Sequence, residues 1–501
     1  MIKKFAAQSI LLSTLVVIGL ATSCKKSSTP ADTASTPETN TLQTSTTNRD
    51  YLTKDSIFLY AKQTYFWNVG MPSYDGFNPR QYATNDAVIA ALKALPSTGG
   101  KDKYSFIDNG AVATQLGGVS GDFGFSIFFA STNDLRIKLV YATSPAATVG
   151  LKRGYQITKI NGFTDINTSK ASIDKIEDAV FGNDATISLT VLKPDGTSQD
   201  VVVSRTTYNI NPILYSNTYT VGTKKVGYIV FNSFTTNSTA LLDAAFAKFA
   251  TDGVSELIVD LRYNGGGSVA TSEAFTNLIA PSSQNGKIMY TTYWTQTMQD
   301  NKATILQNQK FYAKGNDGVT RLYSFFDYPW VPTQAAGNQE VFAKRGTLNN
   351  LSRVYFLVTA STASASELLI NNLKPVMDVK LIGKKTYGKP VGFIGLHIDK
   401  NDLYIPQFQT KNQLNQGDYF DGMTVDKDIA DDITKEFGDQ TEKLLAQALN
   451  YSASGSFLSV LKENTVSSTS ALSKTQAEDL TGKLDHGFKG MIETRKLKLN
   501  K

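Results

Sequence analysis

The sequence has few of the side chains on which most hydrolytic and metal sites depend. Its 501 residues include one cysteine, Cys24, and two histidines, His397 and His486. Two histidines argue against a histidine-rich zinc centre, and neither lies in a setting typical of a Ser-His-Asp triad. One cysteine excludes an internal disulfide. A hydrolase of this composition would most simply pair a serine with a lysine and would need no metal or cofactor.

Long apolar runs are absent except at the N-terminus. The segment "MIKK", then "ILLSTLVVIGLA", then "LATSC" has the basic start, short apolar core and small residues of a secretory signal. Its cysteine resembles that of a bacterial lipoprotein signal, in which Cys24 would carry the lipid. The alternative is an ordinary signal with an incidental cysteine. We therefore expect residues 1–23 to be removed and the chain to be exported and lipid-anchored to the cell envelope, in the periplasm or outer membrane.

A strong charge is also missing. The formal net charge is +6, which falls to +4 when Lys3 and Lys4 leave with the signal, and the basic residues are scattered. Nucleic-acid binding therefore has little support. The stretch "GKKTYGKP" at 383–390 resembles a phosphate-binding P-loop, but Pro390 stands where a Mg²⁺-binding hydroxyl is needed. We expect neither a nucleic-acid nor a nucleotide partner.

Patterning divides the rest of the chain into five regions and predicts a multidomain α/β protein. They are a flexible Ser/Thr/Pro-rich linker (24–50), a small helical domain (51–110), a β-rich domain (111–207), a region of alternating strands and helices (208–450) and a polar tail (451–501). Alternation of strands with longer helices predicts a largely parallel sheet. The polar tail is expected to be a peripheral helix or a loose end.

Two motifs predict a site in the α/β region. "TASTASASELL" follows the apolar strand "RVYFLV" and opens a helix, an arrangement that can expose a nucleophile. Ser364 and Glu367 also fit an S-x-x-E capping box, and that tetrapeptide alone favours capping. "DLRYNGGGS" places three glycines at a strand end, where α/β sheets carry their sites and where backbone N–H groups can face an anion.

These motifs together resemble a known family. "LIVDLRYNGGG", "STASASELL" and "TYGKP", in this order behind a PDZ-like segment, resemble the C-terminal processing peptidases (tail-specific proteases) of serine peptidase family S41. In that family the catalytic lysine lies 25 residues after the nucleophile, and this count leads from Ser364 to Lys389. The resemblance implies a ClpP/crotonase-like α/β catalytic domain over residues 208–450.

The family mechanism implies a role for each matching residue. Ser364 would attack a peptide carbonyl, and Lys389 would have to be neutral to accept the hydroxyl proton. Because a free lysine titrates near pH ~10.4, the amine must be buried or lie among apolar or cationic neighbours. The backbone N–H groups of Ala365 and Gly266 would hold the oxyanion.

Supporting positions match less completely. Glu367 and Thr386 correspond to residues that support the site in relatives. Phe393 stands where many relatives have a glutamine that orients the lysine, and Pro375 stands where an aspartate is frequent. A third catalytic residue is therefore left unassigned.

Residues 118–205 resemble a PDZ domain. "GDFGFSIF" matches its carboxylate-binding loop and first binding strand, with Phe123, Gly124 and Phe125 as peptide-binding residues. "SPAATVGLKRGYQITKING" matches its helix-and-strand core. The alternative is a generic β-rich packing module. A PDZ domain would capture an extended peptide C-terminus as an added strand.

The sequence thus predicts an exported serine endopeptidase that cleaves proteins or peptides near captured, accessible C-termini. One alternative is a catalytically inactive PDZ-containing peptide-binding lipoprotein, which the missing glutamine motivates. The other is a Ser-Lys hydrolase of a different substrate class, such as an amidase.

Overall fold

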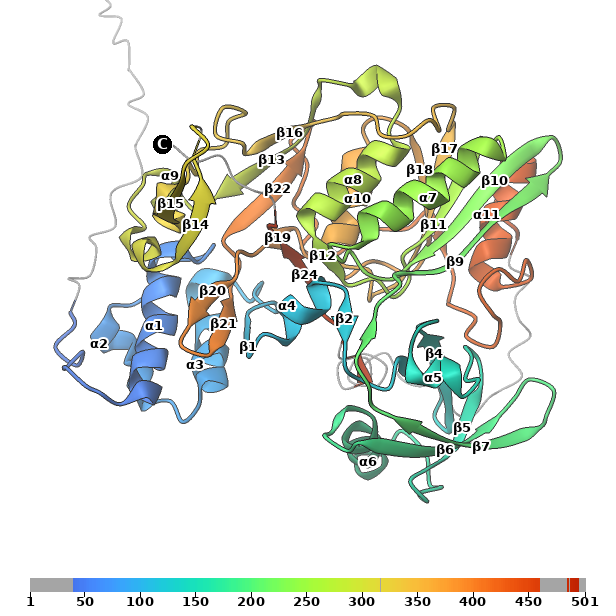
Figure 1. The fold of residues 1–501 in the computed structure, drawn as a ribbon, viewed down its shortest axis with the longest axis horizontal. Helices are drawn as coiled ribbons and strands as arrows, with labels where there is room; N and C mark the ends of the chain where they lie inside the picture. The colour runs from blue at the N-terminus through green and yellow to red at the C-terminus, as the bar shows by residue number, and fades with distance from the viewer. Residues whose placement is uncertain (1–38, 316, 460–483, 486, 495–501) are drawn as a thin grey trace, which may run out of the picture.

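A six-stranded, mostly parallel sheet forms the centre of the molecule (Figure 1). The computed structural model describes residues 39–315, 317–459, 484–485 and 487–494. The strand order is β23-β18-β17-β11-β10-β9, and only β9 and β10 pair antiparallel. The strands are β9 (Ile213–Val221), β10 (Lys224–Phe231), β11 (Glu256–Asp260), β17 (Arg353–Val358), β18 (Asp378–Gly383) and β23 (Lys427–Asp428). The predicted alternation of strands and helices therefore gives a largely parallel sheet.

Helices cover both faces of this sheet. Side chains alternate along β11: Leu257 and Val259 join the larger apolar core, and Ile258 joins a separate cluster on the other face. The larger core contains α7 (Ser238–Thr251), α8 (Val269–Ile279) and α10 (Ala365–Leu373), whereas α11 (Lys443–Ser454) packs on the opposite face. Burial on both faces explains why these strands read as continuous apolar runs.

The topology of the sheet brings three sequence motifs to one edge. Strands β11, β17 and β18 are adjacent and parallel. The glycine loop follows β11, the Ser364 turn follows β17, and residues 384–390 follow β18. The carboxyl ends of parallel neighbours lie at the same edge of a sheet, which is where α/β proteins place their sites. No helix follows residues 383–390, which lead into β19 (Val391–Gly392), so the helix N-terminus of a P-loop is absent there.

The N-terminal helices pack against the same core as the sheet. Ile57 and Phe58 of α1 (Arg49–Thr64) and Leu92 of α3 (Asn85–Lys93) belong to the apolar cluster that contains α7 and α8. This region also includes α2 (Tyr74–Phe77), η1 (Pro79–Gln81), η2 (Pro96–Thr98) and β1 (Phe106–Asp108). Strand β1 completes a three-stranded sheet with β20 (Leu396–Ile398) and β21 (Asn401–Tyr404). The helical region thus shares its core with the α/β region.

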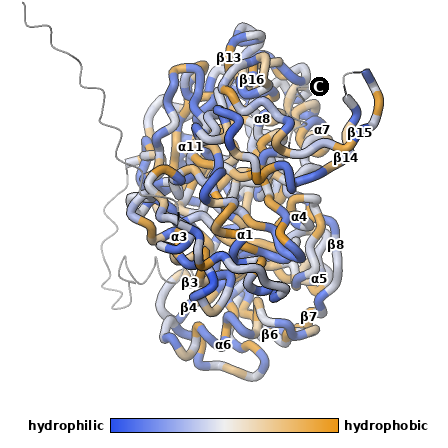
Figure 2. The backbone as a smooth tube through the Cα atoms, turned by 90° about the vertical axis from the view of Figure 1, so that its left-hand side faces the viewer, coloured by the Kyte–Doolittle hydropathy of each residue, from blue (hydrophilic) through white to orange (hydrophobic). Residues whose placement is uncertain are grey.

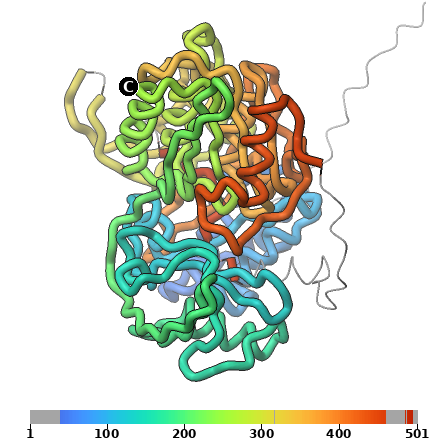
Figure 3. Tube along the Cα trace, turned by 90° about the vertical axis from the view of Figure 1, so that its right-hand side faces the viewer, coloured from blue at the N-terminus to red at the C-terminus, as the bar shows by residue number. Residues whose placement is uncertain are grey.

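Residues 281–350 add a second layer beside the sheet. Four strands lie in the order β16 (Gln339–Val341), β13 (Ile288–Trp294), β22 (Phe408–Asn412) and β19. A hairpin, β14 (Lys310–Lys314) and β15 (Thr320–Ser324), extends away from the body (Figures 2 and 3). The short helices here are η3 (Ser282–Gln284), α9 (Gln296–Gln299), η4 (Thr304–Asn308) and η5 (Phe325–Asp327).

The β-rich region folds around a core of its own, at the bottom of Figure 1. Its five strands run in the order β3-β4-β5-β6-β7, with α5 (Pro145–Thr148) and α6 (Lys170–Phe181) beside them. Its strands are β3 (Phe125–Ser131), β4 (Asp134–Val140), β5 (Gln156–Ile160), β6 (Thr186–Leu192) and β7 (Ser198–Ser204). The connections to the rest of the chain contain α4 (Ala111–Leu116) and the paired strands β2 (Val119–Ser120) and β8 (Tyr208–Asn209).

The end of the chain differs from the peripheral tail that its composition predicts. Residues 490–492 form β24 (Gly490–Ile492), which pairs parallel with β12 (Gly266–Ser268). All three residues are buried. A short apolar stretch, "GMI", within a polar segment is enough to fill a strand position inside the molecule. Within the described residues, no helix is long and apolar enough to cross a bilayer.

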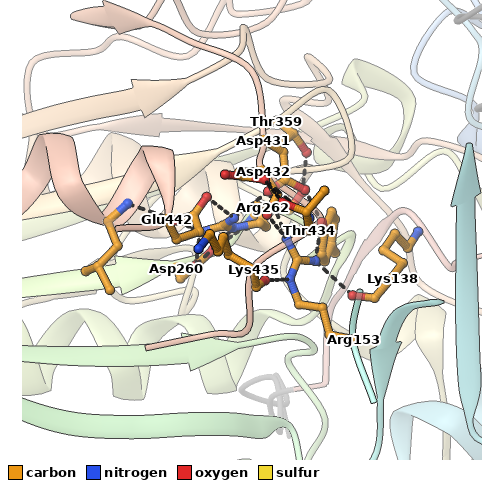
Figure 4. Close-up of polar contacts among 12 residues, drawn as sticks. Lys138, Arg153, Asp260, Arg262, Thr359, Asp431, Asp432, Thr434, Lys435 and Glu442 are labelled. Atoms are coloured by element: carbon orange, nitrogen blue, oxygen red, sulfur yellow. Dashed lines mark hydrogen bonds and ion pairs between the residues drawn. The ribbon is translucent and has the colours of Figure 1, made fainter. Parts of the chain in front are cut away.

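A buried arginine network joins the β-rich region to the sheet (Figure 4). Arg262, immediately beyond β11, binds Asp260 at 2.7 Å and Glu442 at 2.9 Å. Arg153 of the β-rich region binds Asp431 at 3.0 Å, and Asp431 also contacts Arg262. The side chains of Arg262, Asp260 and Glu442 are almost completely buried, so each charge depends on its partners.

We expect Arg262→Met to destabilise the fold strongly, because it leaves the carboxylates of Asp260 and Glu442 buried without their cation. Removing one partner of a buried ion pair costs about 3–5 kcal/mol of unfolding free energy. The control is Arg345→Met, which removes a half-exposed pair with Asp243 and should cost at most about 1 kcal/mol. Urea unfolding followed by circular dichroism measures both, and equal shifts of the two midpoints would contradict the expectation.

Candidate active site

Ser364 occupies a strained turn between β17 and α10. Its backbone has φ 61° and ψ −109°, a conformation that residues other than glycine rarely adopt. The side chain is fully buried, and its Oγ has no hydrogen-bond partner within the described residues. Strain of this kind persists where surrounding contacts enforce it, and it is frequent at nucleophile turns.

The Glu367 carboxylate fixes that turn to the loop that carries Lys389. Its Oε2 accepts hydrogen bonds from the backbone N–H groups of Ser364 and Lys389, both at 2.8 Å. Its Oε1 accepts from the Gly388 N–H at 2.8 Å and from the Thr386 hydroxyl at 2.6 Å. Since the same oxygen accepts from both, the backbone nitrogens of Ser364 and Lys389 are separated by at most the sum of these two hydrogen-bond lengths. Burial raises the pKa of Glu367, and its four hydrogen bonds oppose this rise.

Glu367 therefore does more than cap a helix. It accepts the Ser364 N–H, as a capping glutamate does, but the Ser364 hydroxyl makes no capping hydrogen bond in return. The hydroxyl is left available, and the carboxylate's other three donors come from residues 386–389. The structure places Glu367 and Thr386 in contact with each other, beside the backbones of Ser364 and Lys389.

Lys389 is completely buried. Burial lowers the pKa of its amine well below the usual lysine value, and this outweighs the opposing effects of Asp102 and Glu367. Its Nζ donates a hydrogen bond to the carbonyl oxygen of Lys489 at 2.7 Å. A lysine amine held neutral in this way can accept a proton, which an exposed ammonium group cannot do near neutral pH.

Aromatic rings account for much of this burial. Phe393, which stands in place of the expected glutamine, lies with its ring centroid 3.6 Å from the Lys389 Nζ. The ring of Tyr104 lies 5.3 Å from the same atom, and its hydroxyl donates to the Gly388 carbonyl. Phe393 therefore shields the amine from water, and the oxygen hydrogen-bonded to the amine is the Lys489 backbone carbonyl.

The glycine loop lies directly against the Ser364 turn. The Ala363 N–H donates to the Asn264 carbonyl at 3.1 Å, and the Ser366 hydroxyl donates to it at 3.0 Å. Gly266 has φ 110°, and a Cβ there would lie 2.9 Å from the Ala365 nitrogen. The two predicted oxyanion residues are thus neighbours.

The predicted donor within the glycine loop needs a correction. The Gly266 N–H donates to the Asn264 side-chain oxygen at 2.9 Å, so it is already used inside the loop. The Asn264 amide group also donates to the Phe231 carbonyl at 2.8 Å, which fixes the side chain in place. Ala365 is the first residue of α10, so its N–H has no partner within the helix. Ala365 remains the better-placed donor of the pair.

The remaining predicted residues lie away from this centre. Phe123 and Phe125 are buried in the core of the β-rich region, and the Gly124 N–H donates to its neighbour Asp122 at 2.7 Å. The His397 ring, on β20, is mostly exposed and contacts Asp402 at 3.0 Å. Cys24 and His486 lie outside the described residues. In the part of the chain that the structure describes, no three His, Cys, Asp or Glu side chains are grouped to hold a metal ion.

Sequence reasoning missed two contributors to the site. Tyr104 lies beyond the helices of the N-terminal region, and nothing in its local pattern marks it as a neighbour of Lys389. Residues 487–494 contribute the Lys489 carbonyl and β24. Their only signal is the apolar run "GMI" within a polar segment, which predicts burial but no location.

Comparison with known proteins identifies the family of the central region. Residues 225–430 match the model of Peptidase family S41. The chain is 25% identical over 340 residues to a probable CtpA-like serine protease of Staphylococcus aureus, covering 67% of this chain and 58% of that protein. A probable CtpA-like serine protease of Staphylococcus epidermidis is 24% identical over 311 residues, covering 62% of this chain and 52% of that protein. The chain therefore spans somewhat more than half the length of these relatives.

A solved structure supports the fold. The crystal structure of a putative S41 protease from Bacteroides fragilis matches with a TM-score of 0.55 and 24% identity, over 79% of this chain and 97% of that one. Apart from β9 and the first residue of β10, the six-stranded sheet lies within the residues that match the family model, as do Ser364 and Lys389, which follow β17 and β18. The chain therefore carries a peptidase family S41 domain.

Proposed function

We propose that this protein is a serine endopeptidase in which Ser364 is the nucleophile and Lys389 the general base. The proposal rests on a buried Ser364 hydroxyl without a hydrogen-bond partner and a buried Lys389 amine of lowered pKa, in two residues whose backbone N–H groups bind one carboxylate. An amine and a hydroxyl in such a setting form an activated nucleophile without histidine. The S41 domain and the protease relatives support the same reaction.

The reaction follows from these atoms in two steps. Ser364 Oγ attacks the carbonyl carbon of a peptide bond, and its proton passes to the neutral Lys389 amine. The Ala365 N–H stabilises the resulting oxyanion. The C–N bond then breaks, the lysine returns the proton to the departing amine, and water hydrolyses the ester on Ser364 with the lysine again accepting a proton.

The β-rich region is proposed to capture peptide C-termini as a PDZ-like domain. Strand β3 is an outer strand of its sheet, so one of its edges can pair with an extended peptide. Because the Gly124 N–H is already bonded to Asp122, recognition depends on the rest of the loop and on this strand edge. We also propose that the chain is exported and lipid-anchored through Cys24, on the composition of residues 1–24.

Ser364→Ala should abolish proteolysis, because no other group can form the ester. The rate of casein digestion, measured by release of fluorescent peptides, is expected to fall at least about 10⁴-fold. Ser352→Ala, at an exposed residue just before β17 and at the end of that strand away from Ser364, should retain the wild-type rate. Equal rates for wild type and Ser364→Ala would reject the proposed nucleophile and favour a peptide-binding protein.

Lys389→Met should change how stability depends on pH. The unfolded lysine is protonated below about pH 10.4, whereas the folded one stays neutral down to its lowered pKa. Folding therefore releases a proton in this window, and the wild-type protein gains stability as pH rises through it. The methionine variant lacks this dependence, so it should be relatively more stable near neutral pH, with an advantage that shrinks toward pH 10.

Thermal unfolding between pH 6 and pH 10 measures this difference. Ser364→Ala is the matched control, because it alters the same site without removing an amine, and its curve should run parallel to that of the wild type. Parallel curves for Lys389→Met and wild type would mean that the amine is not held neutral.

Tail capture predicts a dependence on the substrate's terminal carboxylate. Peptides of one sequence that end in a free acid should bind more tightly than their amidated forms, because loop N–H groups bind an anion better than an amide. Fluorescence anisotropy with the Ser364→Ala protein measures binding without cleavage. Equal affinities for the two forms would remove the case for tail capture.

A further inference from the structure

Residues 487–494 cross the candidate active site as an extended strand. The Gly490 N–H donates to the Gly265 carbonyl at 3.0 Å, and β24 continues alongside β12 as far as Ile492. On its other side, the Phe393 N–H donates to the Met491 carbonyl at 2.8 Å. The segment is therefore bonded both to the glycine loop and to the strand that leaves Lys389 (Figure 1).

This segment occupies the space that a substrate needs. The Lys489 carbonyl accepts the hydrogen bond of the Lys389 amine. The Gly490 carbonyl oxygen lies beside the two predicted oxyanion residues: a Cβ on Gly266 would lie 2.3 Å from that oxygen and 2.9 Å from the Ala365 nitrogen. Ser364, Ala365 and Lys389 have no exposed surface while the segment is in place. A substrate carbonyl has to reach these same atoms.

Side chains fix the segment in apolar pockets on both sides. Met491 is fully buried in the main core, and Ile492 is buried beside Tyr104 and Phe393. Thr494 shares a hydrogen bond of 2.6 Å with Ser268. Such contacts combine the backbone pairing and alternate pockets by which proteins bind an extended peptide.

A second anchor precedes the strand. Asp485 accepts the Ser361 hydroxyl at 2.8 Å and pairs with Lys489 at 2.9 Å, and Lys138 of the β-rich region lies 3.5 Å from it. Leu484 is buried in the core of the β-rich region. Leu484 and Asp485, just before the segment, thus tie it to the β-rich region, while the segment itself contacts the glycine loop.

We propose that residues 487–494 are an internal pseudosubstrate that fills the peptide groove of this protein and keeps its catalytic centre closed. This inference rests on the proposed function, and it specifies the class of peptide that the active-site groove binds. The groove accepts an extended strand with a small residue beside Gly266, followed by two apolar residues, as Gly490, Met491 and Ile492 show. The Lys489 carbonyl accepts the hydrogen bond of the proposed base, so the segment occupies the amine as well as the groove.

Two variants displace the segment without changing the catalytic residues. Met491→Asp places a charge in the apolar pocket, and Gly490→Pro removes the N–H that donates to Gly265. In the full chain, each should speed labelling of Ser364 by a fluorophosphonate at least about tenfold, because loss of a buried side chain shifts the closed state toward the open one. Leu414→Asp, an equal change at an exposed site, should label at the wild-type rate.

A peptide added in trans tests the groove itself. The acetylated peptide GFKGMIET, which corresponds to residues 487–494, should slow labelling of the Met491→Asp protein. The same peptide with aspartate in place of its methionine should not. Hydrogen exchange of residues 490–493 shows independently whether the segment is seated, with protection expected in the wild type and lost in both variants. Because exchange needs no activity, it reports on folding and seating even if a variant is catalytically silent.

The outcomes separate this inference from the proposed function. Faster labelling on release, with inhibition by the peptide, supports the pseudosubstrate. Unchanged labelling after release, shown by lost protection, overturns it, and slower labelling also does so, since the segment would then be a necessary part of the site. If Ser364→Ala made in the Met491→Asp background digests casein as well as Met491→Asp alone does, the proposed function fails, whatever the exchange data show.

Discussion

The Glu367 carboxylate is the interaction on which the candidate site depends. It is buried in the first turn of α10, and it accepts four hydrogen bonds from two loops that are separate in sequence. A buried carboxylate needs such donors, because its desolvation is otherwise costly. Those same donors fix the backbones of Ser364 and Lys389 against each other. The position of the strained Ser364 turn beside the Lys389 backbone is thus fixed by hydrogen bonds to one carboxylate.

Enclosure of the lysine shows how the site can work without histidine. A hydroxyl needs a base that is neutral near physiological pH, and histidine usually supplies it. Here, burial lowers the pKa of Lys389 by excluding water, with Phe393 and Tyr104 as walls of the pocket. Phe393 thus contributes to the electrostatics of the site, and in the closed arrangement the Lys489 carbonyl accepts the hydrogen bond of the amine.

Local sequence patterns predicted those structural elements whose formation depends mainly on residues that are close in sequence. The apolar runs before Ser364 and before the glycine loop predicted strands, and parallel pairing placed their ends together. The free N–H of Ala365 follows from its position at a helix start. By contrast, the use of the Gly266 N–H by Asn264 depends on a side-chain rotamer, and the burial of Met491 depends on pairing across more than 220 residues. The run "GMI" indicates burial but not its partner strand, and nothing local indicates the Asn264 contact, because both are decided by tertiary contacts.

The salt-bridge network around Asp431 crosses the boundary between the β-rich region and the region that forms the sheet. Asp431 binds Arg262, which follows β11 of the sheet, and Arg153 of the β-rich region. Its negative charge is therefore balanced by cations from both of these regions. Arg153 also donates to the Tyr263 hydroxyl, two residues before Gly265. In electrostatic terms the β-rich region and the sheet share one buried group of charges, and an evolutionary exchange of either region would have to carry its part of that group with it.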